Sequence, residues 1–281
     1  MSALTSRDNP IADERRADAL STTDTRATAA AVAALVMAEQ YGHSDLSRST
    51  FDYFDAAYRG DLSELLLASL HWIADRQNAD GGWSRQSGGP SDLTTSLLVL
   101  SAFRMTCVPA ADAECEPRLE QYVKKQGGIA AFRRQPIERG KQLGILAACA
   151  AAGLLSWKQL PVIRFERAAA PDLLKRLLQQ PQFDQNDPVL LAYGLARFHR
   201  AMPVNPAVNW LRKASIDRAL RLIRERQSPD GAFQQSVLAT SSIVTSLASA
   251  GYASNSIVRH AVEHLLSSVL PDASWRPLPR D

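Results

Sequence analysis

The chain has 281 residues, of which 46% are hydrophobic and 22% charged, and it carries a formal net charge of +3. This length and apolar fraction suffice for one large hydrophobic core. The basic residues are scattered and do not alternate with aromatic residues, which argues against a nucleic-acid-binding protein.

The sequence predicts a polar tail followed by helices along the rest of the chain. Residues 1–20 are expected to form a disordered tail, and residues 21–281 a single all-α domain of paired helices, because no segment resembles a flexible linker. The alternation typical of strands is nearly absent. The predicted helices span 24–41, 50–58, 62–78, 92–105, 116–126, 138–155, 171–180, 188–201, 206–227, 239–251 and 256–269.

Several helix starts carry capping residues. Ser91 or Asp92 can accept hydrogen bonds from the first turn of the helix that begins near Leu93. Asp187 precedes Pro188, and an acidic residue followed by proline fits the first positions of a helix. Asp187 is therefore expected to be a helix N-cap.

Targeting signals and disulfide patterns are missing from the sequence. The longest apolar runs, 27–38 and 143–155, are shorter than the roughly 20 residues needed to span a bilayer. The first 19 residues carry both signs of charge and do not read as a signal peptide. The three cysteines lack paired spacing, which favours free thiols in a reducing compartment. We expect a cytoplasmic protein, either soluble or peripheral to the membrane.

One segment occurs twice, 150 residues apart, which predicts a repetitive architecture of helical hairpins. Residues 70–83 (LHWIADRQNADGGW) match residues 220–233 (LRLIRERQSPDGAF) without a gap. Each copy has a helix that ends at glutamine, a turn that contains Asp-Gly, and an aromatic residue. Residues 122–128 repeat the Gln-Gly-Gly ending, and residues 271–275 repeat the spacing from aspartate to aromatic residue.

The recurring residues are interpreted as structural. A glutamine amide can both donate and accept at a helix end, where backbone groups lack partners. Glycine permits the tight reversal, and the aromatic residue buries a large surface against the next hairpin. These structural residues are Gln77, Asp80, Trp83, Gln227, Asp230, Phe233, Asp272 and Trp275.

The pattern Gln-x-x-Asp-Gly-x-Trp at 77–83 resembles the QW motif of the squalene–hopene cyclase family and of related class II terpene cyclases. Residues 88–95 (GGPSDLTT) are similar to a stretch that follows that motif in the family, and residues 126–129 and 157–161 match further segments in the same order. The resemblance covers roughly residues 62–275 and corresponds to the N-terminal part of a full-length cyclase.

The resemblance implies an α/α toroid, in which rings of helical hairpins surround an apolar centre. It implies an isoprenoid ligand and an isomerase-type cyclisation that a carboxylic acid starts by protonating an alkene. It also implies that the chain packs against a second helical unit, either a cyclase-type chain or another copy, and leaves peripheral contact with a membrane as an option. Neither a cofactor nor a metal is implied.

The family's catalytic Asp-x-Asp-Asp cluster is missing from this sequence. The nearest string is residues 184–187 (DQND), where Asn186 takes the position of the acid, so Asp187 is only a weak candidate for that role. Two functions therefore stay open: a cyclase-type enzyme or one subunit of it, and a non-catalytic toroid that binds a prenyl chain or a protein. A remnant of a truncated cyclase would belong to the second class.

Two apparent metal motifs are interpreted as ordinary polar surface. His260, Glu263 and His264 match the spacing of inverted zinc proteases, but only 17 residues follow in which a third ligand could lie. Asp52 and Asp55 lack the clustered carboxylates that a magnesium–diphosphate site requires. A zinc-dependent protein prenyltransferase, another barrel of helical hairpins, is disfavoured because Cys107, Cys115 and Cys149 show no ligand pattern.

Overall fold

The computed structural model describes residues 23–42, 62–167 and 187–277. Within these ranges the secondary structure is helical, apart from an isolated bridge between Gln227 and Phe233. The α-helices are α2 (Thr25–Gly42), α4 (Leu62–Ala74), α5 (Leu93–Thr106), α6 (Cys115–Lys125), α7 (Gly128–Phe132), α8 (Arg139–Ala151), α10 (Pro188–Arg200), α11 (Pro206–Glu225), α12 (Val237–Ser249) and α13 (Ser256–Ser267). Short 3₁₀ turns cover Ala110–Asp112, Trp157–Gln159 and Phe165–Arg167.

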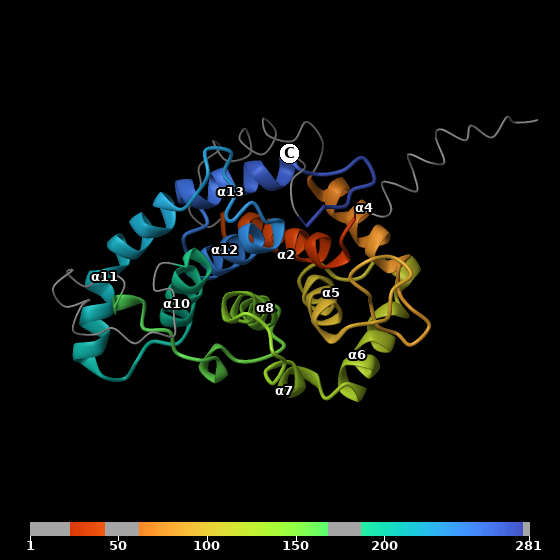
Figure 1. Cartoon of the computed structure of the whole chain (residues 1–281), viewed down its shortest axis with the longest axis horizontal. Coiled ribbons are helices and arrows are strands. Elements are labelled where there is room, and N and C mark those ends of the chain that lie inside the picture. Colours follow the sequence, from red (N-terminus) through yellow and green to blue (C-terminus); the bar gives the residue numbers. More distant parts are fainter. Residues whose placement is uncertain (1–22, 43–61, 168–186, 278–281) are drawn as a thin grey trace, which may run out of the picture.

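Five helices form the interior, and their contacts follow a closed order. Helix α2 packs against α5, α5 against α8, α8 against α10, α10 against α12, and α12 again against α2. The other helices lie outside this group (Figure 1): α4 covers α2, α6 and α7 cover α5, α11 covers α10, and α13 covers α12.

The five interior helices run in parallel. Arg26 near the start of α2 pairs with Asp92 at the start of α5, and Gln234 just before α12 donates to Asp187 at the start of α10. The opposite ends also meet, since Met37 of α2 packs with Ala248 of α12. One end of the bundle therefore gathers helix N-termini and the other gathers C-termini.

Small residues allow the interior helices to approach one another closely. Helix α2 is rich in alanine and is buried along nearly its whole length. A Cβ on Gly144 of α8 would come within 2.6 Å of the Ser242 hydroxyl of α12, so a larger residue there would push the two helices apart. Outer helices bury one stripe only, as α13 does with Ile257, Ala261 and Leu265.

The all-α prediction is confirmed, and nine of the predicted helices have counterparts in the structure. The predicted helices at 50–58 and 171–180 and the predicted tail at 1–20 lie outside the described residues. Helix α8 ends at Ala151, earlier than predicted, because Gly153 adopts a φ of +74° and Leu154 N–H bonds back to Cys149. Helix α7 was not predicted as a separate helix.

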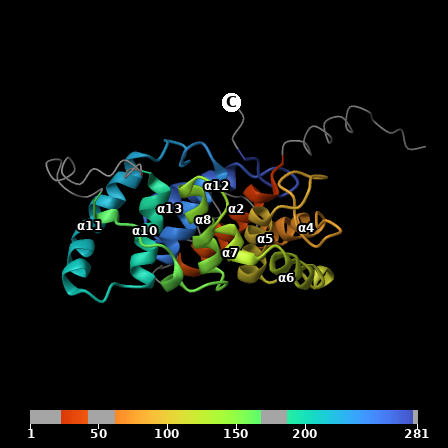
Figure 2. The same ribbon diagram turned by 60° about the horizontal axis from the view of Figure 1, so that its bottom comes forward.

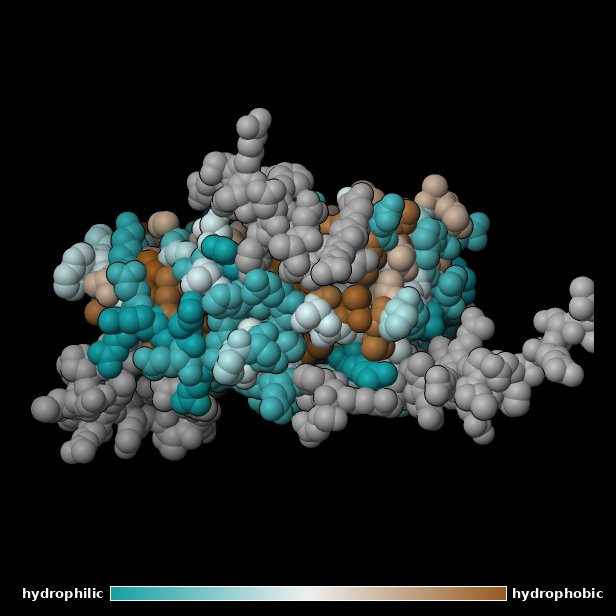
Figure 3. Space-filling model, turned by 90° about the horizontal axis from the view of Figure 1, so that it is seen from above, coloured by the Kyte–Doolittle hydropathy of each residue, from teal (hydrophilic) through white to brown (hydrophobic). Residues whose placement is uncertain are grey.

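None of the helices in the described residues combines the length and the hydropathy needed to cross a bilayer. Seen from above, the surface has two brown apolar areas separated by teal polar side chains (Figure 3). On this face, the visible apolar surface is therefore divided into patches.

Candidate functional site

The glutamines of the repeated segment connect neighbouring outer helices. Gln77 Nε2 donates to the carbonyl oxygen of Gly81, in its own turn, and to that of Cys115, the first residue of α6, at 3.0 and 2.9 Å. Gln227 Nε2 makes the same two bonds, to Gly231 and to Ile257 near the start of α13, both at 3.0 Å. Each glutamine therefore joins the end of one outer helix to the start of the next.

The aspartates shape three equivalent turns. Oδ1 of Asp80, Asp230 and Asp272 accepts a hydrogen bond from the backbone N–H two residues later, at 3.0, 3.2 and 3.3 Å. The residue after each aspartate has a positive φ, from +61° to +89°, which glycine adopts without strain. Glycine follows the first two aspartates, and Ala273 follows the third.

The aromatic residue of each turn is completely buried and fixed to the next interior helix. The backbone N–H of Trp83, Phe233 and Trp275 donates to the hydroxyl of Ser96, Thr240 and Thr28, each at 3.0 Å. Each hydroxyl lies three residues after the first residue of its helix. The turn thus sets the position of one interior helix through a buried hydrogen bond.

The third turn has the same backbone geometry but takes its partners from the other end of the sequence. Val269 stands where glutamine stands in the other two copies. Ser69 Oγ of α4 instead donates to the carbonyl oxygen of Ala273 at 2.7 Å, and Trp72 Nε1 donates to Asp272 Oδ2 at 2.8 Å. The last turn of the described chain therefore binds the first outer helix and α2, which closes the circle of contacts.

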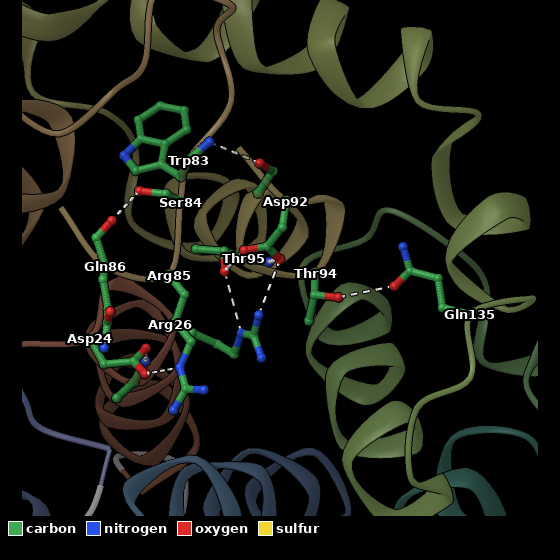
Figure 4. Close-up of polar contacts among 12 residues, drawn as sticks. Asp24, Arg26, Trp83, Ser84, Arg85, Gln86, Asp92, Thr94, Thr95 and Gln135 are labelled. Carbon is green, nitrogen blue, oxygen red and sulfur yellow. Dashed lines mark hydrogen bonds and ion pairs between the residues drawn. The ribbon is translucent and has the colours of Figure 1, made fainter. Parts of the chain in front are cut away.

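A polar network surrounds the N-termini of α2 and α5 (Figure 4). Arg26 of α2 pairs with Asp92 at 3.1 Å, and its Nε donates to Thr95 Oγ1 at 3.3 Å. Asp92 caps α5 by accepting from the backbone N–H of Thr95 at 2.8 Å, and Arg85 pairs with Asp24 at 2.6 Å. The segment 88–95 thus has a structural explanation, because its carboxylate and hydroxyl groups hold two interior helices together.

Asp187 is the N-cap of α10, as the sequence predicts. Its Oδ1 accepts from the backbone N–H of Val189 at 2.9 Å and from Gln234 Nε2 at 3.3 Å. Both donors stabilise an ionised carboxylate, whereas protonating an alkene requires a neutral acid. Asp187 lines an open polar pocket of about 380 Å³ together with Glu138, Arg226, Ser228, Gln234 and Gln235.

The described residues contain no group of three histidine, cysteine or acidic side chains arranged to hold a metal. His264 is buried and its Nδ1 lies 3.3 Å from Asp230 Oδ2, so it belongs to the second turn. Asp52 and Asp55 lie outside the described residues. All three cysteines are free thiols, and burial raises the pKa of Cys149 to about 11.

An apolar groove of about 430 Å³ lies at the C-terminal end of the interior helices. Its walls are the ends of α2 and α5 and the facing side of α4. Sequence reasoning missed this groove, because its walls come from three separate helices. Leu67 of α4, 49% exposed, stands at its surface. The apolar lining residues are Val36, Leu66, Leu67, Leu70, Met105 and Val108, and Glu39 contributes a carboxyl group.

The sequence was compared with protein-family models and with curated proteins. Neither comparison gave a match to this chain.

Proposed function

We propose that the protein is an α/α toroid of the class II terpene cyclase type that binds a neutral isoprenoid chain and does not itself start cyclisation. The resemblance in the QW-type segments suggests the family, and the closed order of interior and outer helices is what a toroid requires. The three matching turns support this proposal, because each holds an interior helix by the same bond from a backbone N–H to a side-chain hydroxyl.

The apolar groove suggests how the ligand binds. A volume of about 430 Å³ falls within the range of about 300–1,000 Å³ usual for small-ligand sites. The C-terminal ends of α2 and α5 lie beside the groove and carry partial negative charge. These charges disfavour a prenyl diphosphate, so the ligand is a hydrocarbon or alcohol.

The single observation that carries the non-catalytic part of the proposal is the position of Asp187. It lies at the N-terminal end of α10, whereas the groove lies at the C-terminal ends of the parallel helices α2 and α5. An interior helix of 13 residues rises about 20 Å. The nearest match to the family's acid is therefore too far from the groove to protonate a ligand bound there.

Binding of farnesol and of squalene by the purified protein tests the proposal. The wild type is expected to bind both, and Leu67→Glu is expected to weaken binding by at least tenfold because it places a second carboxylate in the groove. Val162→Glu is the matched control, since Val162 is similarly exposed and does not line the groove. Equal affinity of all three proteins would refute the proposed site.

A further inference from the structure

The polar pocket that Asp187 lines lies where three interior helices begin. It is built from the starts of α8 and α10, the second repeated turn and the connection from that turn into α12. Helices α8, α10 and α12 pack against one another, and α10 lies between α11 and α8 in both views of the ribbon (Figure 1 and Figure 2). The lining residues are Glu138, Asp187, Pro188, Arg226, Ser228, Gln234 and Gln235.

The first copy of the repeat shows what Arg226 lacks. Arg76, 150 residues earlier, holds the same position. Its guanidinium lies 3.7 Å over the ring of Trp72 and donates to the carbonyl oxygen of that residue at 2.8 Å. Leu222 replaces the tryptophan in the second copy, and the side chain of Arg226 forms no hydrogen bond or ion pair with the described residues. Its guanidinium is therefore available to a ligand.

The same difference recurs at two further positions of the pocket. Asn78, the counterpart of Ser228, donates from its amide to a backbone carbonyl and to a hydroxyl group, at 3.1 and 2.8 Å. Arg85, the counterpart of Gln235, pairs with Asp24 at 2.6 Å. Within the described ranges the side chains of Ser228 and Gln235 form no such bonds. Three polar positions that are used internally in the first copy are thus unpaired in the second.

The backbone at the edge of the pocket is strained. Gln234 and Gln235 both have a left-handed conformation, with φ of +52° and +47°, which residues other than glycine rarely adopt. Ser84 and Arg85, at the same positions of the first copy, lie outside this region. The turn itself therefore does not require the strain. Strained backbone of this kind gathers at ligand-binding sites, and here it brings the Gln234 amide to Asp187 at 3.3 Å.

Both signs of charge line the pocket. Glu138 pairs with Lys141 at 2.9 Å, but both side chains are 60% exposed, so water screens this pair and a ligand can replace it. Asp187 is held in place from α8, since a Cβ on Gly140 would come within 2.5 Å of its Oδ2. The guanidinium of Arg226 matches a carboxylate group by two parallel hydrogen bonds. The lining is therefore complementary to a ligand that carries an ammonium and a carboxylate group.

We propose that this pocket binds a small zwitterion of the free amino acid type. Arg226 binds the carboxylate group, Glu138 and Asp187 face the ammonium group, and Gln235 bonds to polar atoms of the ligand. A dianion would meet two carboxylates, and a diamine would leave the guanidinium unpaired. The volume of about 380 Å³ is within the range of small-ligand sites. This proposal is independent of the groove and of its ligand.

Thermal unfolding in the presence of each standard amino acid, followed by calorimetric titration of the most stabilising one, tests the proposal. A ligand that binds only the folded protein raises the unfolding midpoint, so at least one amino acid should do so. Ethanolamine, which lacks the carboxylate group, and acetate, which lacks the ammonium group, should each bind at least tenfold more weakly than that amino acid. No shift with any amino acid, or equal binding of either fragment, overturns the proposal.

Substitutions in the lining identify the charges that recognise the ligand. Arg226→Gln should weaken amino acid binding by at least tenfold, because the carboxylate group of the ligand loses its partner. Arg221→Gln is the matched control, since Arg221 is an exposed arginine of the same helix that does not line the pocket. Arg226→Glu should bind a diamine such as putrescine in place of the amino acid. Wild-type affinity in Arg226→Gln overturns the proposal.

Gln235→Gly separates a binding role from a structural one. Glycine adopts a positive φ without strain, so the unfolding midpoint should rise, while the loss of the amide should weaken amino acid binding. Gln86→Gly, in the exposed connection that follows the first repeated turn, should not raise the midpoint and should leave binding unchanged. Wild-type affinity in Gln235→Gly, or a lowered midpoint, overturns the proposal that the strained edge serves a ligand.

Two binding assays, read together, keep this inference separate from the proposed function. Leu67→Glu should lose the isoprenoid and keep the amino acid, whereas Arg226→Gln should lose the amino acid and keep the isoprenoid. Circular dichroism of both variants should match the wild type, because both side chains are exposed. Joint loss of both ligands in either variant overturns the assignment of two separate sites. Binding of an amino acid by a protein that binds no isoprenoid would refute the proposed function and leave this inference standing.

Discussion

The backbone N–H of Trp275 donates to Thr28 Oγ1 at 3.0 Å, across 247 residues of sequence. The same bond occurs between Phe233 and Thr240 only seven residues apart. A hydrogen bond that is local in one repeat is thus long-range in another, and this change closes the chain of contacts between the two ends of the described structure.

Thr28→Val should destabilise the protein about as much as Thr240→Val does. Each substitution keeps the shape of the side chain but leaves a buried backbone N–H without an acceptor, which costs about 1–3 kcal/mol. Thermal unfolding checks this, since each kcal/mol lowers the midpoint by about 2–4 °C in a domain of this size. If Thr240→Val lowered the midpoint and Thr28→Val did not, the hydrogen bond between Trp275 and Thr28 would not be formed.

Trp83→Ala should lower the free energy of unfolding by about 3–5 kcal/mol. The indole is completely buried, packs edge-on against Phe103, and donates from Nε1 to the carbonyl oxygen of Ile73. Denaturant unfolding gives the value directly. Trp210→Ala is the control for tryptophan loss at an exposed position, and an equal, small effect of both substitutions would contradict the structural role of Trp83.

Gly231→Ala should be far more damaging than Gly88→Ala. Both glycines have a positive φ, which costs alanine about 1–2 kcal/mol. A Cβ at Gly231 would in addition overlap the carbonyl oxygen of His260, whereas a Cβ at Gly88 meets no atom within 4 Å. We expect a loss of at least about 3 kcal/mol for Gly231→Ala, measured by denaturant unfolding. Similar losses at the two positions would argue against close packing of the turn on α13.

The free energy of unfolding should fall at alkaline pH, because the buried thiol of Cys149 loses its proton more readily in the unfolded chain. Burial raises its pKa from 9.0 to about 11, so the unfolded chain loses this proton at a lower pH than the folded protein. Stability is therefore complete below pH 9 and falls as the pH rises from 9 to 11, by about 3 kcal/mol for this thiol. Between pH 8 and pH 10.5, the free energy of unfolding should fall less in Cys149→Ala than in the wild type. If the two proteins gave parallel curves of unfolding free energy against pH, the burial of this thiol would be contradicted.

The sequence predicted the repeated turns and, through the resemblance, a ring of helical hairpins, but not the residues that close the order of contacts. The ungapped repeat placed Gln77 and Gln227 at equivalent positions, and their bonds are the same. Nothing in the sequence indicated that Ser69 and Thr28 would complete the third turn, because their partners lie 204 and 247 residues away. The apolar groove was likewise hidden, since its walls come from three helices.

Asp187 shows where sequence reasoning was sufficient. Capping by an aspartate before a proline depends on neighbours two residues away, and the bond to Val189 is present. Its distance from the groove depends on the direction in which five helices run, which no local pattern specifies. Residues 184–186, which complete the string that resembles the acid cluster, lie outside the described residues.

Mass spectrometry of the ligand after incubation tests the central claim most directly. Purified protein is incubated with squalene and, separately, with a linear prenyl diphosphate, and the lipids are then extracted. We predict that squalene binds and is recovered unchanged, and that neither substrate yields a cyclic product above the level of a protein-free control. A cyclic product that disappears in Asp187→Asn or in Glu39→Gln would contradict the account and identify the acid.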